Sequence, residues 1–301
     1  MERALTLAVF AVVALAAWLE SRSTAAACVR AGKPWATLIA FEAAPEPPRL
    51  YLALFHPAKR AADLVYIPDS TKMTDGRPLS AAREDSLAND ADPAGAAKDE
   101  ADAARELLRP LLGLDADGGA GRFVYVQAAP SDEPDPALQG AAWTRRLPWR
   151  LAFSTKGLRA DIGRAERLVA AVELHRLGRA GLRPAWLPED DGARRAFLGR
   201  LATEAPPAKP ERLTVEVLNA TGRHGIALEA TKILRSGGAD VMASSNAPSR
   251  QDKTVIYDRS GAFENASTVK RMLGCRDAEE VSRPDEKRLV DVTVILADDC
   301  F

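Results

Sequence analysis

The sequence of 301 residues has few aromatic side chains, histidines and cysteines, and almost no net charge. Aromatic residues make up only 6% of the chain, so a core must rest mainly on aliphatic side chains. Its three histidines and three cysteines form no CxxC pair or Cys/His cluster, which leaves a zinc site without support. A formal net charge of −1 excludes a disordered polyelectrolyte and a globally basic nucleic-acid binder. The length is that of about two domains.

The chain contains one long apolar run, at its N-terminal end, and composition excludes a multispan membrane protein. Residues 4–19 (ALTLAVFAVVALAAWL) follow Arg3 and end before Glu20. As a helix the run would be about 24 Å long, short of a hydrocarbon core of ~30 Å but long for a signal peptide. Both a membrane anchor and a signal peptide send the rest of the chain across the membrane. We therefore expect a cell-membrane or exported protein whose bulk is extracytoplasmic, in the periplasm or cell envelope.

Three fates of this N-terminal segment remain open. The run can stay as an uncleaved anchor, or be cleaved at the A-x-A pattern that ends at Ala27. Cys28 follows that pattern directly and would be the acceptor of a lipid. Glu20 and Arg22 lie between the apolar run and Cys28, and they argue against lipidation.

The other two cysteines, Cys275 and Cys300, lie near the C-terminal end. They would pair in a compartment that oxidises thiols and stay free in one that does not. A disulfide between them would stabilise this end of the chain by about 3 kcal/mol in the chain-entropy description.

Hydrophobic patterning predicts an α/β arrangement in the first part of the chain. Strands are predicted at residues 35–41, 50–55, 63–67 and 123–127. Helices are predicted at residues 98–112 and from Asp161 onward. In the second helix, Asp161 is placed to cap the N-terminus. One face of this helix is expected to be apolar, formed by Ile162, Ala165, Val169 and Val172.

A proline-rich stretch at residues 205–210 (APPAKP) predicts a linker between two domains. Beyond it, strands are predicted at 213–218, 240–244, 253–257 and 290–296, with helices at 225–235 and 262–273. That β-α-β-β-α-β order predicts a compact α+β sandwich with its helices on one face of a small sheet. We expect a signal segment (1–27), an α/β domain (28–204), a linker (205–211) and a small α+β domain (212–301).

Charge is distributed unevenly within the first domain. Residues 83–106 hold three Lys/Arg and eight Asp/Glu, a net −5, whereas residues 143–183 hold ten Lys/Arg and three Asp/Glu, a net +7. Arg164 and Arg167 lie three residues apart within the basic segment, on the helix face away from the apolar stripe. Guanidinium groups bind phosphate in a bidentate manner, so this placement suits either exposure to water or display into a phosphate-binding cleft. Spacing alone does not choose between them.

The region beyond the linker resembles the C-terminal domain of LytR-type proteins of the LytR-CpsA-Psr cell-envelope group. The resemblance rests on residues 215–222 (VEVLNATG) with Gly225, residues 254–257 (TVIY) and residues 291–296 (DVTVIL). The family's first block reads roughly V-x-V-L-N-G-T-G-x-x-G, and Ala220 replaces its first glycine here.

This first block predicts a polar turn from a strand to a helix. Asn219, Thr221, Gly222 and Gly225 are the candidate binding residues, because the backbone N–H groups of such a turn can receive an anion or a sugar hydroxyl. The alternative is that they only shape a tight turn.

The first domain resembles the catalytic domain of the same group. Two segments, 51–57 (YLALFHP) and 66–71 (YIPDST), are similar to its strand-turn-strand unit that ends in S-I-P-R-D-T. A third segment, 161–167 (DIGRAER), is similar to the D-x-G-R-x-x-R motif at the start of one of its helices. Family enzymes transfer glycopolymers from a polyprenyl-pyrophosphate carrier to peptidoglycan with arginines and a divalent metal. The resemblance implies Asp69, Arg164 and Arg167 as candidate catalytic residues, with Asp69 helping to hold Mg²⁺ and the arginines clamping phosphate.

The chain departs from this pattern at one position that matters for chemistry. No arginine stands between Pro68 and Asp69, so one expected pyrophosphate contact is missing. Loss of one preorganised charged contact can cost about 2.7–4 kcal/mol of transition-state stabilisation. Arg77, Arg145 and Arg146 are candidates to compensate.

Two functions are therefore expected from the sequence. The first is a membrane-anchored cell-envelope protein with a diverged, non-catalytic first domain and a second domain that binds peptidoglycan, a glycopolymer or an envelope protein. The alternative is an active, Mg²⁺-dependent phosphotransferase that moves a glycopolymer from polyprenyl pyrophosphate to peptidoglycan. A transcriptional regulator has no helix-turn-helix candidate here, so no nucleic-acid partner is expected.

Overall fold

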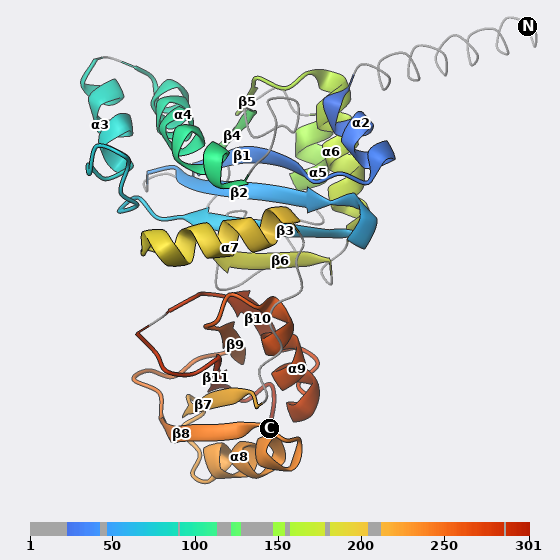
Figure 1. The fold of residues 1–301 in the computed structure, drawn as a ribbon, viewed down its shortest axis with the longest axis vertical. Helices are drawn as coiled ribbons and strands as arrows, with labels where there is room; N and C mark the ends of the chain where they lie inside the picture. Colours follow the sequence, from blue (N-terminus) through green and yellow to red (C-terminus); the bar gives the residue numbers. More distant parts are fainter. Residues whose placement is uncertain are drawn as a thin grey trace, which may run out of the picture. The chain divides into compact units, whose positions relative to one another are not determined.

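The computed structural model describes residues 23–42, 47–89, 91–112, 122–127, 147–153, 157–177, 181–203, 212–285 and 287–301. The chain divides into two compact units, the first ending at Leu182 and the second beginning at Arg183 (Figure 1). The apolar run 4–19 and most of the expected linker lie outside the described residues, so both stay predictions. Within those ranges, no helix is long and apolar enough to cross a membrane.

The first unit is built on a mixed sheet, as expected for an α/β domain. Its strands lie in the order β5 (Leu158–Ala160), β4 (Phe123–Gln127), β1 (Trp35–Glu42), β2 (Arg49–His56) and β3 (Ala61–Ile67). β1 pairs in parallel with β4, and the β1–β2 and β2–β3 pairs are antiparallel. The aliphatic and aromatic runs of the sequence form these strands because both faces of the sheet are covered.

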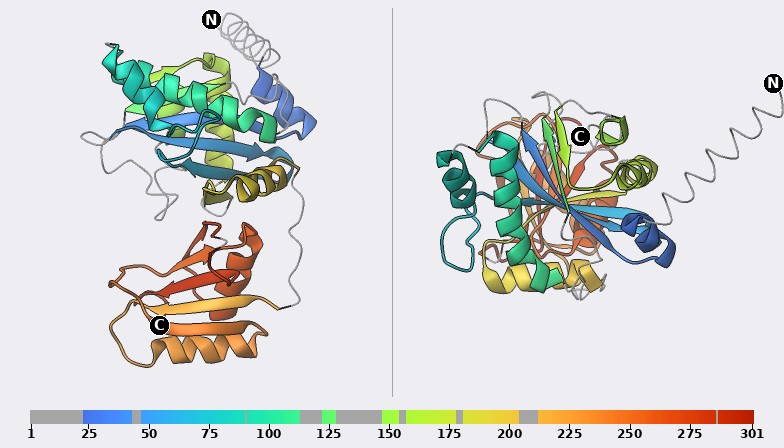
Figure 2. Two further views of the ribbon diagram at one scale, coloured as in Figure 1. Left: turned by 60° about the vertical axis from the view of Figure 1, so that its left-hand side comes forward. Right: turned by 90° about the horizontal axis from the view of Figure 1, so that it is seen from above.

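Helices cover this sheet from two sides, as the right-hand view of Figure 2 shows. α4 (Pro93–Leu112) contacts β1 and β4, and α3 (Ser80–Ala88) packs on α4. On the other side, α6 (Arg164–Leu177) contacts β3 and the two helices beside it, α2 (Thr24–Ala31) and α5 (Leu147–Phe153). The short helix η1 (Pro57–Lys59) joins β2 to β3.

Helix α6 differs from its prediction in two ways. Asp161 does not begin the helix; its Oδ1 accepts a hydrogen bond from the Phe123 N–H at 2.6 Å, which ties the segment after β5 to the start of β4. The buried face is also turned by one position, so that Ala171 is buried and Val172 is exposed.

β6 (Leu182–Trp186) begins at the boundary between the units and lies otherwise in the second unit, which also contains α7 (Asp191–Thr203). The sheet of the second unit has the strand order β6, β10, β9, β11, β7, β8. The elements of this sheet are β7 (Thr214–Asn219), α8 (Ile226–Ser236), β8 (Asp240–Asn246), β9 (Val255–Asp258), α9 (Phe263–Leu273), β10 (Glu279–Ser282) and β11 (Val292–Leu296). Both helices pack on each other and share one core with the sheet.

Strand β10 corrects the predicted β-α-β-β-α-β order, because it adds a strand between α9 and β11 in the chain, and this strand lies between β6 and β9 in the sheet. Its sequence EEVS has one apolar residue, Val281, so alternation did not reveal it. β10 pairs in parallel with β9, and β9 pairs antiparallel with β11. β7 lies between β11 and β8 and is parallel to both.

A disulfide joins Cys275, just after α9, to Cys300, just after β11, with a Cα–Cα distance of 5.1 Å. Because it closes a loop of 25 residues, we expect reduction to lower the free energy of unfolding of the second unit by about 3 kcal/mol. Urea titrations with and without reductant measure this difference. A variant with both cysteines replaced by serine is the control, and its midpoint should not respond to reductant. Free alkylation of both thiols in the unreduced protein would contradict the expectation.

Candidate functional site

The family-like motif after β3 forms a turn that is bonded to the start of α3. The Thr71 N–H donates to the Pro68 carbonyl oxygen at 2.9 Å, and the Leu79 N–H donates to the Thr71 carbonyl oxygen at 2.8 Å. The Ser80 N–H donates to the Asp69 carbonyl oxygen at 3.1 Å. These bonds place the carboxylate of Asp69 beside α3.

Arg83 of α3 occupies that position and connects Asp69 to α4. Its Nη2 donates to Asp69 Oδ2 at 2.8 Å, and its Nη1 donates to the two carboxylate oxygens of Glu100 at 3.0 and 2.8 Å. Arg83 and Glu100 are 6% and 1% exposed. This pair was not predicted; the sequence shows only that Arg83 follows the apolar Leu79 by four residues and so shares its helix face.

One buried cation thus serves two carboxylates. Burial raises the pKa of Glu100 to about 7, although the charge of Arg83 opposes that rise. Burial also lowers the pKa of Arg83, but its bonds to Asp69 and Glu100 outweigh this and raise it, so the guanidinium stays charged. A perturbed carboxyl group can mark a catalytic site. Glu100 is closed to solvent and bonded to Arg83, so its position fits a structural ion pair between α3 and α4.

Asp69 does not fit the divalent-metal role that the family resemblance implies. Its Oδ2 is held by the guanidinium of Arg83. In the ranges that the structure describes, no group of three or more His, Cys, Asp or Glu side chains is placed to hold a metal ion. The donor set around Asp69 is therefore unsuited to Mg²⁺.

The other two candidate catalytic residues lie on α6, away from Asp69. Arg164 is exposed at the first position of α6, and Arg167 is partly buried one turn later. Figure 2 shows α6 across the sheet from α3 and α4. Among the described residues, no hydrogen bond or ion pair joins Asp69 to either arginine. The structure therefore does not bring the three residues together.

Of the three arginines expected to compensate for the missing contact, one lies in the described ranges. Arg77 is exposed and bonded to Asp75 at 3.0 Å and to Asp85 at 2.8 Å. Arg145 and Arg146 lie outside the described residues.

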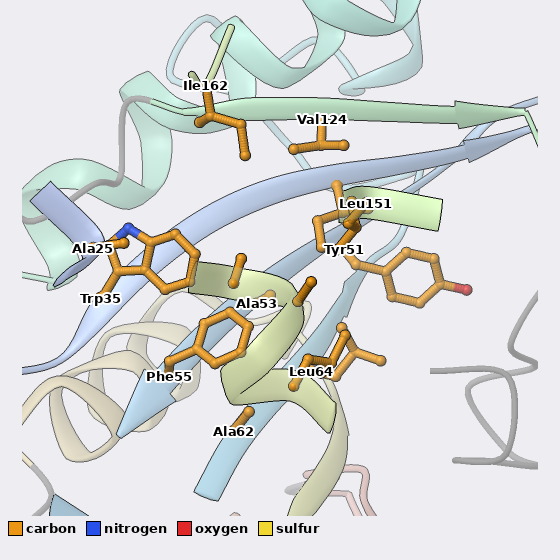
Figure 3. Close-up of a cluster of buried hydrophobic side chains, with 14 of the residues drawn as sticks. Ala25, Trp35, Tyr51, Ala53, Phe55, Ala62, Leu64, Val124, Leu151 and Ile162 are labelled. Atoms are coloured by element: carbon orange, nitrogen blue, oxygen red, sulfur yellow. The ribbon is translucent and has the colours of Figure 1, made fainter. Parts of the chain in front are cut away.

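The space between the sheet and helices α5 and α6 is filled by side chains (Figure 3). The rings of Trp35 and Phe55 lie 4.7 Å apart, and the same buried cluster includes Leu151 of α5 and Ile162 of the segment between β5 and α6. The remaining cavity measures about 20 Å³. That is room for about one water molecule, whereas ligand pockets measure roughly 300–1,000 Å³. As far as the structure describes this core, it leaves no cleft for a polyprenyl chain.

The candidate binding turn in the second unit uses its side chains internally. Asn219 Oδ1 accepts bonds from the N–H and the hydroxyl of Thr221 at 3.0 and 2.7 Å, and Asn219 Nδ2 donates to the Arg223 carbonyl oxygen at 2.7 Å. Gly222 and Gly225 have φ angles of 76° and 88°, which only glycine adopts readily. These four residues shape the entry to α8, and their part in binding stays a prediction.

A second polar feature of this unit was missed at the sequence level. Arg259, at the end of β9, is partly buried over the ring of Tyr257, and its guanidinium bonds neutral groups, the Thr293 hydroxyl at 3.2 Å and the Arg283 carbonyl oxygen at 3.4 Å. Burial and the nearby charges of Arg288 and Arg283 lower the pKa of Arg259. A cavity of about 280 Å³, the cationic cavity, borders Arg200, Arg259 and Arg288, and the carboxyl groups of Asp285 and Asp291 also line it. Arg288 pairs with Glu216 and, at 3.5 Å, with Asp285. In the sequence, Arg259 follows the predicted strand 253–257 while Arg283 and Arg288 precede the predicted strand 290–296, so no local spacing joins them.

The family model described as LytR cell envelope-related transcriptional attenuator matches residues 212–299 of the chain. No curated protein matches the chain.

Three solved structures are similar to parts of the chain. The soluble domain of a conserved hypothetical secreted protein of Mycobacterium marinum is 26% identical; the match covers 33% of this chain and 68% of that chain, with a TM-score of 0.24. TagV of Bacillus subtilis is 10% identical over 60% of this chain and 99% of that chain, with a TM-score of 0.36. Lmo1026 of Listeria monocytogenes, described as a transcriptional factor, is 11% identical over 54% and 82%, with a TM-score of 0.32.

Proposed function

Since residues 212–299 form a LytR C-terminal domain, we propose that the chain is an extracytoplasmic cell-envelope protein involved in cell-wall or glycopolymer assembly. The run 4–19 anchors it in the membrane. The first unit is a diverged, non-catalytic relative of the LytR-CpsA-Psr catalytic domain and serves as a scaffold. The second unit binds an anionic component of the envelope.

The filled core of the first unit is the observation that carries the scaffold role. An enzyme that acts on a polyprenyl carrier needs an apolar cleft for the lipid and charged groups at its mouth. Here Trp35 and Phe55 occupy the apolar space, and a cavity of about 20 Å³ remains. Asp69 is bonded to Arg83, and Arg164 and Arg167 lie on another helix. A substrate would have no place to bring these groups together.

The cationic cavity supports the binding role of the second unit. Arg259 lacks a bonded carboxylate among the described residues, and the charges of Arg288 and Arg283 act on it from nearby. A phosphate or carboxylate of a wall polymer would relieve this repulsion and bond the guanidinium groups in a bidentate manner. The anionic ligand class follows from this chemistry.

Sedimentation with purified cell walls tests the binding role. We expect Arg259→Met to weaken binding roughly tenfold or more, because a hydrogen bond to a charged group contributes about 1.5–3 kcal/mol. Arg250→Met is the matched control, since Arg250 is exposed, pairs with Asp298 at 2.9 Å and does not border the cavity. Equal binding by both variants, with unchanged melting temperatures, would exclude the cationic cavity as the site.

The active phosphotransferase is the alternative, favoured by the family-like residues 66–71 and 161–167. The two functions differ in turnover of a polyprenyl-pyrophosphate-linked glycopolymer in the presence of peptidoglycan and Mg²⁺. We expect no transfer by the full chain and no difference between it and Arg164→Ala. Transfer by the native chain that is lost in Arg164→Ala would establish the enzyme instead.

A further inference from the structure

Helices α5 and α6 expose a set of large apolar side chains that does not belong to either site described above. This apolar patch consists of Trp149 (57% exposed), Phe153 (70%), Leu168 (48%) and Val172 (39%). The rings of Trp149 and Phe153 are stacked with centroids 6.0 Å apart, and Trp149 also contacts the His175 ring at 5.6 Å. Contiguous exposed apolar surface on a soluble unit marks a contact with another molecule or a membrane.

The spacing of these residues directs the patch outward. Trp149 and Phe153 are four residues apart on α5, and Leu168 and Val172 are four residues apart on α6. Residues at that spacing share a helix face. The opposite face of α6, with Ala170 and Leu174, is buried against the sheet. The patch is therefore not a displaced part of the core.

Arginines accompany the patch. Arg164 lies one turn before Leu168 on the same face of α6, and Arg176 lies one turn after Val172; both are exposed. Arg150 lies next to Trp149 on α5 and donates a hydrogen bond to the Gln127 carbonyl oxygen, and Arg176 pairs with Glu173 at 3.0 Å on the surface of α6. Aromatic and aliphatic side chains together with basic residues are the composition of a surface that binds the headgroup region of an anionic bilayer.

The path of the chain places this patch near the proposed anchor. The N–H of Thr24, in the first turn of α2, donates to Glu166 Oε1 of α6 at 3.0 Å, and Glu166 also pairs with Arg122. Figures 1 and 2 show α2 beside α6. The apolar run ends at residue 19, and the five residues from there to Thr24 span at most about 17 Å. A membrane-inserted run therefore holds α6 close to the bilayer surface.

We propose that the apolar patch on α5 and α6 is a second membrane contact, in which Trp149, Phe153, Leu168 and Val172 enter the headgroup region of an anionic bilayer. Arg150, Arg164 and Arg176 contact the lipid phosphates. The inference rests on the anchored location proposed above. This second contact would fix the face that the first unit turns toward the membrane, whereas the anchor alone would leave its orientation free.

A label at position 168 tests this contact in the full chain. An environment-sensitive fluorophore is attached to the new cysteine of the Leu168→Cys variant. The label reacts there because Cys28 is buried and Cys275 and Cys300 form a disulfide. The protein is reconstituted in phosphatidylcholine vesicles with or without phosphatidylglycerol, and quenching by lipid spin labels is measured. We expect quenching in the anionic vesicles that falls at high salt. The control label replaces Leu228, which is 59% exposed on α8 of the second unit, and should stay unquenched.

A second variant separates the patch from the anchor. Trp149→Ser with Phe153→Ser removes two exposed rings and should reduce quenching at position 168 roughly tenfold, with no change in melting temperature. Carbonate extraction reports the anchor independently. If the chain stays in the membrane after carbonate extraction while the label at position 168 reports an aqueous environment, the membrane contact of the patch is refuted and the anchor is not. If carbonate extracts the chain although the label at position 168 was quenched before extraction, the membrane anchor is refuted and the membrane contact of the patch is supported. An unquenched label with a dimeric mass would place a second copy there and also overturn the inference.

Discussion

Trp35→Ala is expected to lower the free energy of unfolding of the first unit by about 3–5 kcal/mol. Trp35 is 1% exposed and lies in β1, with its ring 4.7 Å from that of Phe55. Small residues surround it, among them Ala25 and Ala53, and they cannot move inward far enough to fill the space that an indole leaves. The loss combines the transfer of apolar surface with the cost of a new cavity.

Urea denaturation of the native protein and the variant measures this loss. Trp149→Ala is the matched control, because Trp149 is 57% exposed and its removal should change stability by at most about 0.5 kcal/mol. A loss below about 1 kcal/mol for Trp35→Ala would mean that the indole is not packed as described. The scaffold role of the first unit would then lose its main support, since that role depends on this space being filled.

Arg83→Met is expected to cost a similar amount, about 3–5 kcal/mol, because it leaves Glu100 buried without its cation. Arg83 contacts both Glu100 and Asp69, so the variant removes the connection between α3, α4 and the turn after β3. Arg77→Met is the control. Arg77 is exposed and pairs with Asp75 and Asp85, so its loss should cost less than about 1 kcal/mol.

The pH dependence of stability gives an independent measurement of this ion pair. The pKa of Glu100 is raised from 4.5 to about 7 in the folded protein, mainly by burial. The folded state therefore binds more protons than the unfolded state between these values, and the contribution of Glu100 to stability falls as pH rises from about 4.5 to 7. Glu100→Gln should lose this dependence, so the stability difference between the native protein and the variant should change between pH 5 and 8. A constant difference would contradict the raised pKa.

Alternating apolar runs made several strands predictable. Residues 123–127 coincide with β4, and the predicted runs at 35–41 and 50–55 lie within β1 and β2. Strand β10 and helices α2, α3 and α5 were missed. Alanine-rich and charged segments offer little contrast between buried and exposed faces, and EEVS has a single apolar residue to indicate a strand. The face of α6 was assigned one residue out of register because the run Val169-Ala170-Ala171-Val172 is apolar on adjacent faces of the helix.

The candidate sites were harder to predict than the strands. Local motifs identified the turn after β3 and the turn from β7 to α8, because glycine, proline and asparagine act within a few residues. The partners of Asp69 come from other elements, Arg83 being 14 residues away, and no local spacing specifies such a contact. The filling of the core by Trp35 and Phe55 is likewise a property of packing between layers. Transferase chemistry depends more on such contacts between distant elements than on the local motifs at residues 66–71 and 161–167.

The position of β11 sets the order in which the second unit can fold as the chain is synthesised. β11 completes the sheet between β9 and β7, and Asp291, just before β11, bonds Thr214, 77 residues earlier in the chain. Until residues 292–296 have left the ribosome, β7 and β9 expose unpaired edges, and neither can reach its final neighbour. Such long-range pairing folds slowly and is open to wrong pairing while it waits. A chain interrupted before residue 292 is therefore expected to be prone to aggregation through these edges.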